Sequence, residues 1–435
     1  MIAGCGRQFG DWSADYRLFA RERFDPGALF SVARQELCDV LPAGAPYLTA
    51  LDDSYLPKAG RKTAGVGFCR DSHAPPYLAN LVRAQRIVQL SGALPAGERP
   101  CAARGIPVDL VLAPAPQRPA RSAPPTEWQR WRQQKAAANI NLIGGQRIAA
   151  LRAALDASPQ GAGRRLMVAC DGRFTNGTVL RSLPERSTLI GRVRRDTALC
   201  YPPKAGAGTG RPRLYGRRAP TPEELLADPA HPWQSVRVYA AGRSHAMRVK
   251  TIGPLRWRAA GAGCDLRLVV VAPLAYRPSA HSKLLYRKPA YLLCSDPDLP
   301  LDELLQAYVW RWEIEVNFRD EKQLLGAGEA QVRSWPAVER VPQLIVASYA
   351  LLLLAARRVY GAAGLPDTLP PPRWRAHRPP PRATTANLIA QLRAELWGRA
   401  LGSDRFSGFW SHDRREQKPE KRSPSLPSAV LYAVA

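Results

Sequence analysis

One short segment, YVWRWEIEVNFRDEK over residues 308–322, carries polar side chains at a regular spacing. The spaced residues are Tyr308, Arg311, Glu315 and Lys322. An α-helix turns by about 100° per residue, so a continuous helix places these side chains in one stripe, with Arg319 on the same side. Cations and a phenol bind phosphate oxygens, and a carboxylate binds a metal ion. The alternative is a solvated helix face with i,i+4 ion pairs.

Two further acidic sites follow short apolar segments. YLTALDD, residues 47–53, predicts a strand that ends in two acids, and LMVACDG, residues 166–172, predicts a strand that runs into Asp171. Alternation along a strand sends Asp52 and Asp53 to opposite faces, so only one of the two can share a site with other acids.

The fixed spacing in residues 308–322 resembles the signature of the insertion-sequence-four type of DDE transposase, Y-x-x-R-x-x-x-E-x-x-x-x-x-x-K. The resemblance implies a ribonuclease H-like core with Glu315 as the third catalytic acid. It also implies that Tyr308, Arg311 and Lys322 hold DNA phosphates near the cut. We therefore expect Arg311 and Lys322 to be exposed and to act through DNA rather than through folding.

In this family the first acid ends an early strand in a D-[ST] context, which Asp53 and Ser54 supply. The second acid ends a later strand, which indicates Asp171. Asp296 also ends an apolar segment, but it lies too close to Glu315 along the chain to leave room for the insertion that the family carries there. A simple turn-forming Asp-Gly is the alternative for Asp171.

The resemblance implies that Asp53, Asp171 and Glu315 bind two Mg²⁺ ions, for which Mn²⁺ can substitute. Such ions supply a nucleophile and stabilise the leaving oxygen in phosphodiester cleavage. Some relatives pass through a DNA hairpin, in which a tryptophan of the insertion receives a flipped base. Trp257 is the candidate here, and a core tryptophan is the alternative.

The chain's composition agrees with a DNA-bound protein. Its 435 residues carry a formal charge of +27, which attracts polyanions, although a GC-rich genome that favours Arg codons gives the same excess. The eight cysteines form no C-x-x-C pair, which indicates reduced thiols in a cytosol, and the resemblance implies a cytoplasmic, nucleoid-associated bacterial protein. The longest apolar run, residues 344–356, is shorter than the 20 or so residues that a membrane span needs.

We predict an α/β fold, a ribonuclease H-like mixed sheet interrupted by a β-rich insertion that projects from the core, with a helical C-terminal part. Residues 301–326 are expected to form one long helix that ends at Gly326. The basic segments 204–218 and 373–382 are either duplex contacts or solvated charge. The expected parts are a short helical segment (1–45), the first part of the core (46–199), the insertion (200–290), the final core strand and helices (291–360), and a Pro/Arg-rich linker, helix and basic tail (361–435).

The predicted function is DNA transposition on double-stranded element ends and target DNA, by a homodimer when bound to DNA. Two alternatives stay open. One is a nuclease of the same fold that nicks DNA without joining it. The other is a truncated, non-catalytic DNA-binding regulator of transposition.

Overall fold

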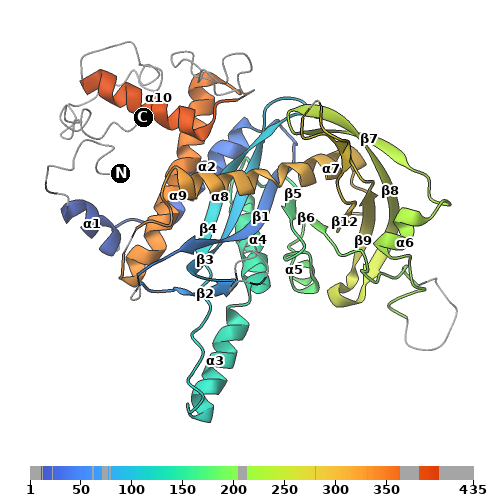
Figure 1. Cartoon of the computed structure of the whole chain (residues 1–435), viewed down its shortest axis with the longest axis horizontal. Coiled ribbons are helices and arrows are strands. Elements are labelled where there is room, and N and C mark those ends of the chain that lie inside the picture. Colours follow the sequence, from blue (N-terminus) through green and yellow to red (C-terminus); the bar gives the residue numbers. More distant parts are fainter. Residues whose placement is uncertain are drawn as a thin grey trace. The chain divides into compact units, whose positions relative to one another are not determined.

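The computed structural model describes residues 11, 13–21, 23–60, 63–70, 77, 80–203, 213–279, 281–330, 332–362 and 382–400. It divides into two compact units, which are considered one at a time. The sheet unit comprises residues 34–57 and 66–318, and the helical unit comprises residues 1–33, 58–65 and 319–435. Figure 1 shows the course of the chain.

A mixed sheet forms the centre of the sheet unit. Its first strands are β1 (Tyr47–Pro57), β2 (Gly67–Arg70), β3 (Leu81–Pro95), β4 (Ala103–Leu112), β5 (Leu166–Cys170) and β6 (Ser187–Arg192). Strand β1 lies between β3 and β5, antiparallel to β3 and parallel to β5, and β5 is in turn parallel to β6. All five residues of β5 are buried, as expected for a central strand covered on both faces. This arrangement is compatible with the predicted ribonuclease H-like core.

The segment expected as an insertion is rich in strands, but these strands extend the main sheet. They are β7 (Gln234–Ala240), β8 (Arg243–Trp257), β9 (Gly261–Val271) and the two-residue strands β10 (Ala275–Tyr276) and β11 (Leu285–Tyr286), with one helix, α6 (Pro222–Ala227). Strand β12 (Ala290–Cys294) pairs with β6 on one side and β9 on the other. The expectation that this segment projects from the core is therefore wrong. Four of the five β12 residues are buried, and pairing both of its edges satisfies their backbone groups.

The predicted long helix is two helices. Helix α7 (Leu301–Trp310) ends before Arg311, and α8 (Glu313–Gln323) begins after Trp312. Between them the N–H groups of Trp312 and Ile314 donate to carbonyls only three residues back. This tighter winding differs from that of an α-helix, so a single helical wheel does not describe residues 308–322.

Other helices of the sheet unit are α3 (Pro125–Ala137), α4 (Ile140–Asp156) and α5 (Gly177–Arg181), while α2 (Pro26–Val40) runs from one unit into the other. The helical unit holds α1 (Ser13–Ala20), α9 (Trp335–Tyr360) and α10 (Thr385–Ala400). By length and composition alone α9 could cross a membrane, but 56% of its most apolar window is buried, as in the core helix of a soluble protein. This single helix is weak evidence for a span.

A buried carboxylate joins three helices of the helical unit. The hydroxyls of Tyr349 on α9 and Thr385 on α10 both donate to Asp320 on α8, at 3.3 Å and 2.6 Å. Asp320 is 4% exposed, so these bonds and the contacts of Arg319 compensate for its loss of hydration.

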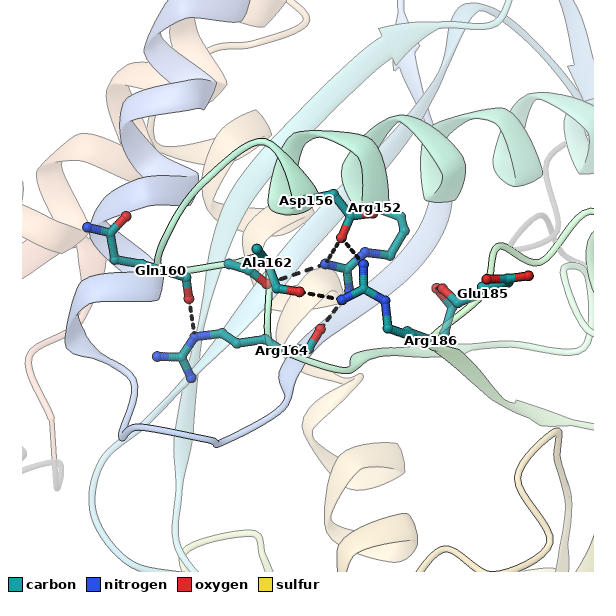
Figure 2. A network of polar contacts seen from close by, with 9 residues as sticks. Arg152, Asp156, Gln160, Ala162, Arg164, Glu185 and Arg186 are labelled. Carbon is teal, nitrogen blue, oxygen red and sulfur yellow. Dashed lines mark hydrogen bonds and ion pairs between the residues drawn. The ribbon is translucent and has the colours of Figure 1, made fainter.

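Two buried arginines hold the chain where β5 begins. Arg164 donates to five backbone carbonyls, namely Cys38, Leu41, Pro42, Ala45 and Gln160, at 2.8–3.1 Å. Arg152 on α4 donates to the carbonyl of Arg164 and to Asp156, which also pairs with Arg186 (Figure 2). These bonds fix the entry into β1 and the entry into β5 against one another.

Arg164→Lys is expected to destabilise the protein by about 2–6 kcal/mol. A lysine ammonium has three donors, so at least two of the five carbonyls lose their partner, and each costs about 1–3 kcal/mol when buried. The matched control is Arg195→Lys, because Arg195 is 70% exposed in its pair with Glu223 and such pairs contribute about 0–1 kcal/mol. Urea unfolding measures both, and equal midpoints would contradict this role for Arg164.

Candidate active site

The parallel pairing of β1 with β5 brings two acids to the same edge of the sheet. Leu51 pairs with Cys170, so Asp52 and Asp171 occupy the next level of the two strands. Residues at one level of neighbouring parallel strands share a face, so these carboxylates face the same side. Burial and the neighbouring charge of Asp171 raise the pKa of Asp52 to about 7.

Arg311 connects Asp52 to the predicted third acid. Its guanidinium lies 3.5 Å from the Asp52 carboxylate and 3.0 Å from that of Glu315. The Arg311 side chain is 12% exposed and also lies over the Tyr308 ring, 5.7 Å from the centroid. Tyr308, Arg311 and Glu315 thus form one cluster. The expectation of an exposed Arg311 is wrong, because its side chain lies between two carboxylates and the Tyr308 ring.

The start of α8 is held on strand β4. The Asn317 amide donates to the carbonyl of Gly105 at 3.0 Å, and the Gly105 N–H donates to Glu313 at 3.4 Å. A Cβ at Gly105 would lie 2.6 Å from the Asn317 side-chain oxygen, so this close approach requires glycine. The Trp310 indole donates to the carbonyl of Cys101 at 2.9 Å. These contacts set the position of Glu315.

Asp53 has a different partner. Its carboxylate accepts from Arg173 at 3.0 Å, and its side chain is 6% exposed. Burial raises the pKa of Asp53, while the charges of Arg173 and Arg86 oppose that rise. Arg173 also donates its backbone N–H to the Asp171 carboxylate. The structure therefore brings Asp52, rather than Asp53, to Arg311 and Glu315.

Asp296, the alternative to Asp171, lies elsewhere. Its carboxylate pairs at 3.0 Å with Arg165, the residue just before β5, whereas Asp171 follows the other end of that strand. Arg165 also pairs with Glu303 at 3.0 Å. Asp296 and Asp171 are therefore at opposite ends of β5.

The other predicted DNA contacts fall outside this cluster. Arg319 and Lys322 belong to the helical unit, where exposed Arg319 pairs with Asp320 and burial lowers the pKa of Lys322. Trp257 is half-buried at the end of β8, where it pairs with Gly261.

The two basic segments are described only in part. Residues 204–212 and 373–381 lie outside the described residues. Within the rest of the first segment, Arg217 stacks on Tyr201 and Arg218 pairs with Glu224 at 2.7 Å. Both side chains are exposed, and each already makes a contact with another residue of the chain.

The carboxylates have the right chemistry for Mg²⁺, which prefers oxygen ligands. Their arrangement does not fit a bound ion, because Arg173 holds Asp53 and Arg311 holds Asp52 and Glu315. Across the described part of the chain, no group of three or more His, Cys, Asp or Glu side chains lies close enough to hold a metal ion.

Arg311→Gln is expected to destabilise the protein by about 1–3 kcal/mol, since it leaves the largely buried carboxylate of Asp52, and the partly exposed one of Glu315, without their cation. Arg195→Gln, which removes the same charge from an exposed pair, is expected to cost at most about 1 kcal/mol. The measurement is urea unfolding in the presence of a metal chelator. If both variants unfold at one midpoint, the Arg311 bridge adds nothing to stability.

Comparison with known families identifies the matching part of the chain. A family model described as a DDE superfamily endonuclease matches residues 10–259, which is 250 of the 435 residues. The match includes Asp52, Asp53 and Asp171, while Glu315 lies beyond it. A search of curated proteins found no match. The matched share and the shared sheet edge of its acids show that the chain belongs to the DDE superfamily endonucleases.

Proposed function

We propose that the chain is a DNA transposase of the insertion-sequence-four type, which cuts phosphodiester bonds at element ends and joins the freed ends to target DNA. The observation that carries the proposal is the Arg311 bridge between Asp52 and Glu315, beside Asp171. It gathers the strand-end acids and three residues of the spaced signature, Tyr308, Arg311 and Glu315, around one point.

The proposed catalytic acids are Asp171, Glu315 and one member of the Asp52–Asp53 pair. The geometry favours Asp52, because it shares the Arg311 bridge with Glu315 and lies level with Asp171. Asp53, which the D-[ST] context of the sequence favours as the first catalytic acid, is the alternative on the same strand.

Arg311 and Tyr308 are the proposed contacts for the phosphate beside the cut. A guanidinium held between carboxylates is oriented before DNA arrives, and it can form charge-assisted bonds to phosphate oxygens. Arg319 and Lys322 are proposed as further phosphate contacts, with Trp257 as the residue that receives a flipped base. The formal charge of +27 supports a DNA partner.

Members of this superfamily generally use divalent metals, and we propose Mg²⁺, two ions per site. The carboxylates would have to leave their arginines before they could bind ions. We also propose a homodimer on DNA.

An endonuclease that cuts without joining is the second candidate, and the family match favours it because its description names only the endonuclease activity. A supercoiled plasmid that carries the DNA flanking the gene separates these functions. Nicking alone indicates the endonuclease, and nicking with strand transfer indicates the transposase. DNA binding without cleavage in Mg²⁺ or Mn²⁺ would indicate the non-catalytic regulator.

Asp52→Asn, Asp171→Asn and Glu315→Gln are each expected to lower the nicking rate at least about a hundredfold while DNA binding is retained, because each removes a charge from the reacting site. Asp53→Asn is the matched control and should lower it by less than about tenfold. Nicking in Mg²⁺ and filter binding in chelator give the two readouts. If Asp53→Asn lowers the nicking rate more than Asp52→Asn does, the first catalytic acid is Asp53. Full activity of Asp171→Asn would contradict the proposed set of catalytic acids.

A further inference from the structure

A helical arm leaves the sheet unit between β4 and α4. It comprises residues 113–138, which include helix α3, and Figure 1 shows α3 extending beyond the sheet of this unit. Helix α3 has no buried residue. A surface helix ordinarily buries an apolar stripe against its own protein, so packing on the sheet does not account for this one.

The arm has a small core of its own. Trp128 and Trp131 meet edge to face with ring centroids 5.6 Å apart, and the Trp131 indole donates to the carbonyl of Pro116 at 3.3 Å. Arg118 lies over the Trp128 ring at 5.3 Å, and Lys135 lies over the Trp131 ring at 4.8 Å. The incoming segment therefore covers one face of α3, which supports the helix without help from the sheet.

The opposite face of α3 is polar and open. With about 100° per residue and Trp128 as the origin, Arg130 lies near 200°, and three glutamines flank it between roughly 100° and 240°. These glutamines are Gln129, Gln133 and Gln134. Their side chains and that of Arg130 are all exposed. Arginine and glutamine form paired hydrogen bonds with base edges in the major groove of DNA, which is wide enough for an α-helix.

The arm is also strongly basic. It has five cations and one acid, Glu127, which gives a net charge of +4. The cations are Arg118, Arg121, Arg130, Arg132 and Lys135. In the described ranges of the chain, none of them forms an ion pair with a carboxylate. The charge is therefore available to an anionic partner.

We infer that residues 113–138 form a DNA-reading arm, in which α3 enters the major groove of a duplex. The face of Gln129, Arg130, Gln133 and Gln134 meets base edges, and flanking cations such as Arg121 and Arg132 meet phosphates. A protein partner fits less well, since the open face has none of the aromatic anchors that dominate protein interfaces. The inference rests on the proposed action on DNA and adds the element that selects the sequence.

The role of the arm's cations is tested with Arg121→Gln, Arg130→Gln and Arg132→Gln combined. The cations that stack on the two tryptophans are Arg118 and Lys135, which this variant keeps, so the melting temperature should not change. The two lost phosphate contacts, at Arg121 and Arg132, should lower the salt slope of binding to a random-sequence 30-base-pair duplex by about 1.8, and the affinity at 50 mM salt should fall more than about tenfold. The control variant, Arg194→Gln, Arg195→Gln and Arg218→Gln, removes equal charge from cations that already pair with acids, and should change neither value much.

Base reading is tested with Gln129→Ala, Gln133→Ala and Gln134→Ala combined, which leaves the charge unchanged and favours the helix. This variant should keep the salt slope but lose the motif that the wild-type chain enriches from a randomised duplex pool. An unchanged motif would overturn base reading by the arm. If the wild-type chain binds duplex DNA and the triple arginine variant of the arm binds it as well as the control variant does, the DNA-reading role of the arm is contradicted while the proposed function stands. A wild-type chain that does not bind duplex DNA would overturn the proposed function itself.

Discussion

The parallel register of β1 on β5 is the constraint on which the candidate site depends. Once Leu51 pairs with Cys170, the acids that follow each strand must meet at one edge of the sheet. Arg152 and Arg164 fix that register at the other end of the two strands. Arg164 donates to backbone carbonyls just before β1, and Arg152 donates to the carbonyl of Arg164, just before β5. Strands β3 and β4 then bring Gly105 to the place where α8 starts, so that Glu315 comes to the same edge.

The charges at this edge explain why arginines belong to it. Three or four carboxylates that lose hydration together repel one another, as the raised pKa of Asp52 shows. Arg311 and Arg173 compensate for part of this cost in the structure described here. A site of this kind is held together by cations, and the same guanidinium groups are suited to the phosphates of a substrate. Under the proposed function, folding and DNA binding use the same side chains, so a mutation at Arg311 is expected to affect both.

The sequence patterns predicted individual strands and helices better than they predicted strand pairing and helix boundaries. A buried strand such as β5 is predicted by an apolar run followed by an acid, which is how the sequence indicated Asp171, whereas Glu315 was predicted from the fixed spacing of the resembled signature. Whether Asp52 or Asp53 lies beside Asp171 depends on which residues of β1 and β5 are paired. That register is set by the contact between the two strands, so the sequence of one strand does not contain it. The end of α7 before Arg311 could not be predicted from the sequence, because Arg311 and Trp312 are both compatible with a continuous helix. The extension of the sheet through β12 depends on long-range pairing, which local periodicity cannot show.

The central proposal is that the ends of β1 and β5 and the start of α8 form one reacting site, whose carboxylates bind metal ions once they leave Arg173 and Arg311. Iron(II) in place of Mg²⁺ tests this most directly, because bound iron with peroxide and ascorbate cleaves the polypeptide beside its ligands. The account predicts three sets of fragments, cut near residues 52–53, near residue 171 and near residue 315, all suppressed by excess Mg²⁺. Cleavage near Asp296 and Glu303 instead, or near only one of the three segments, would contradict it.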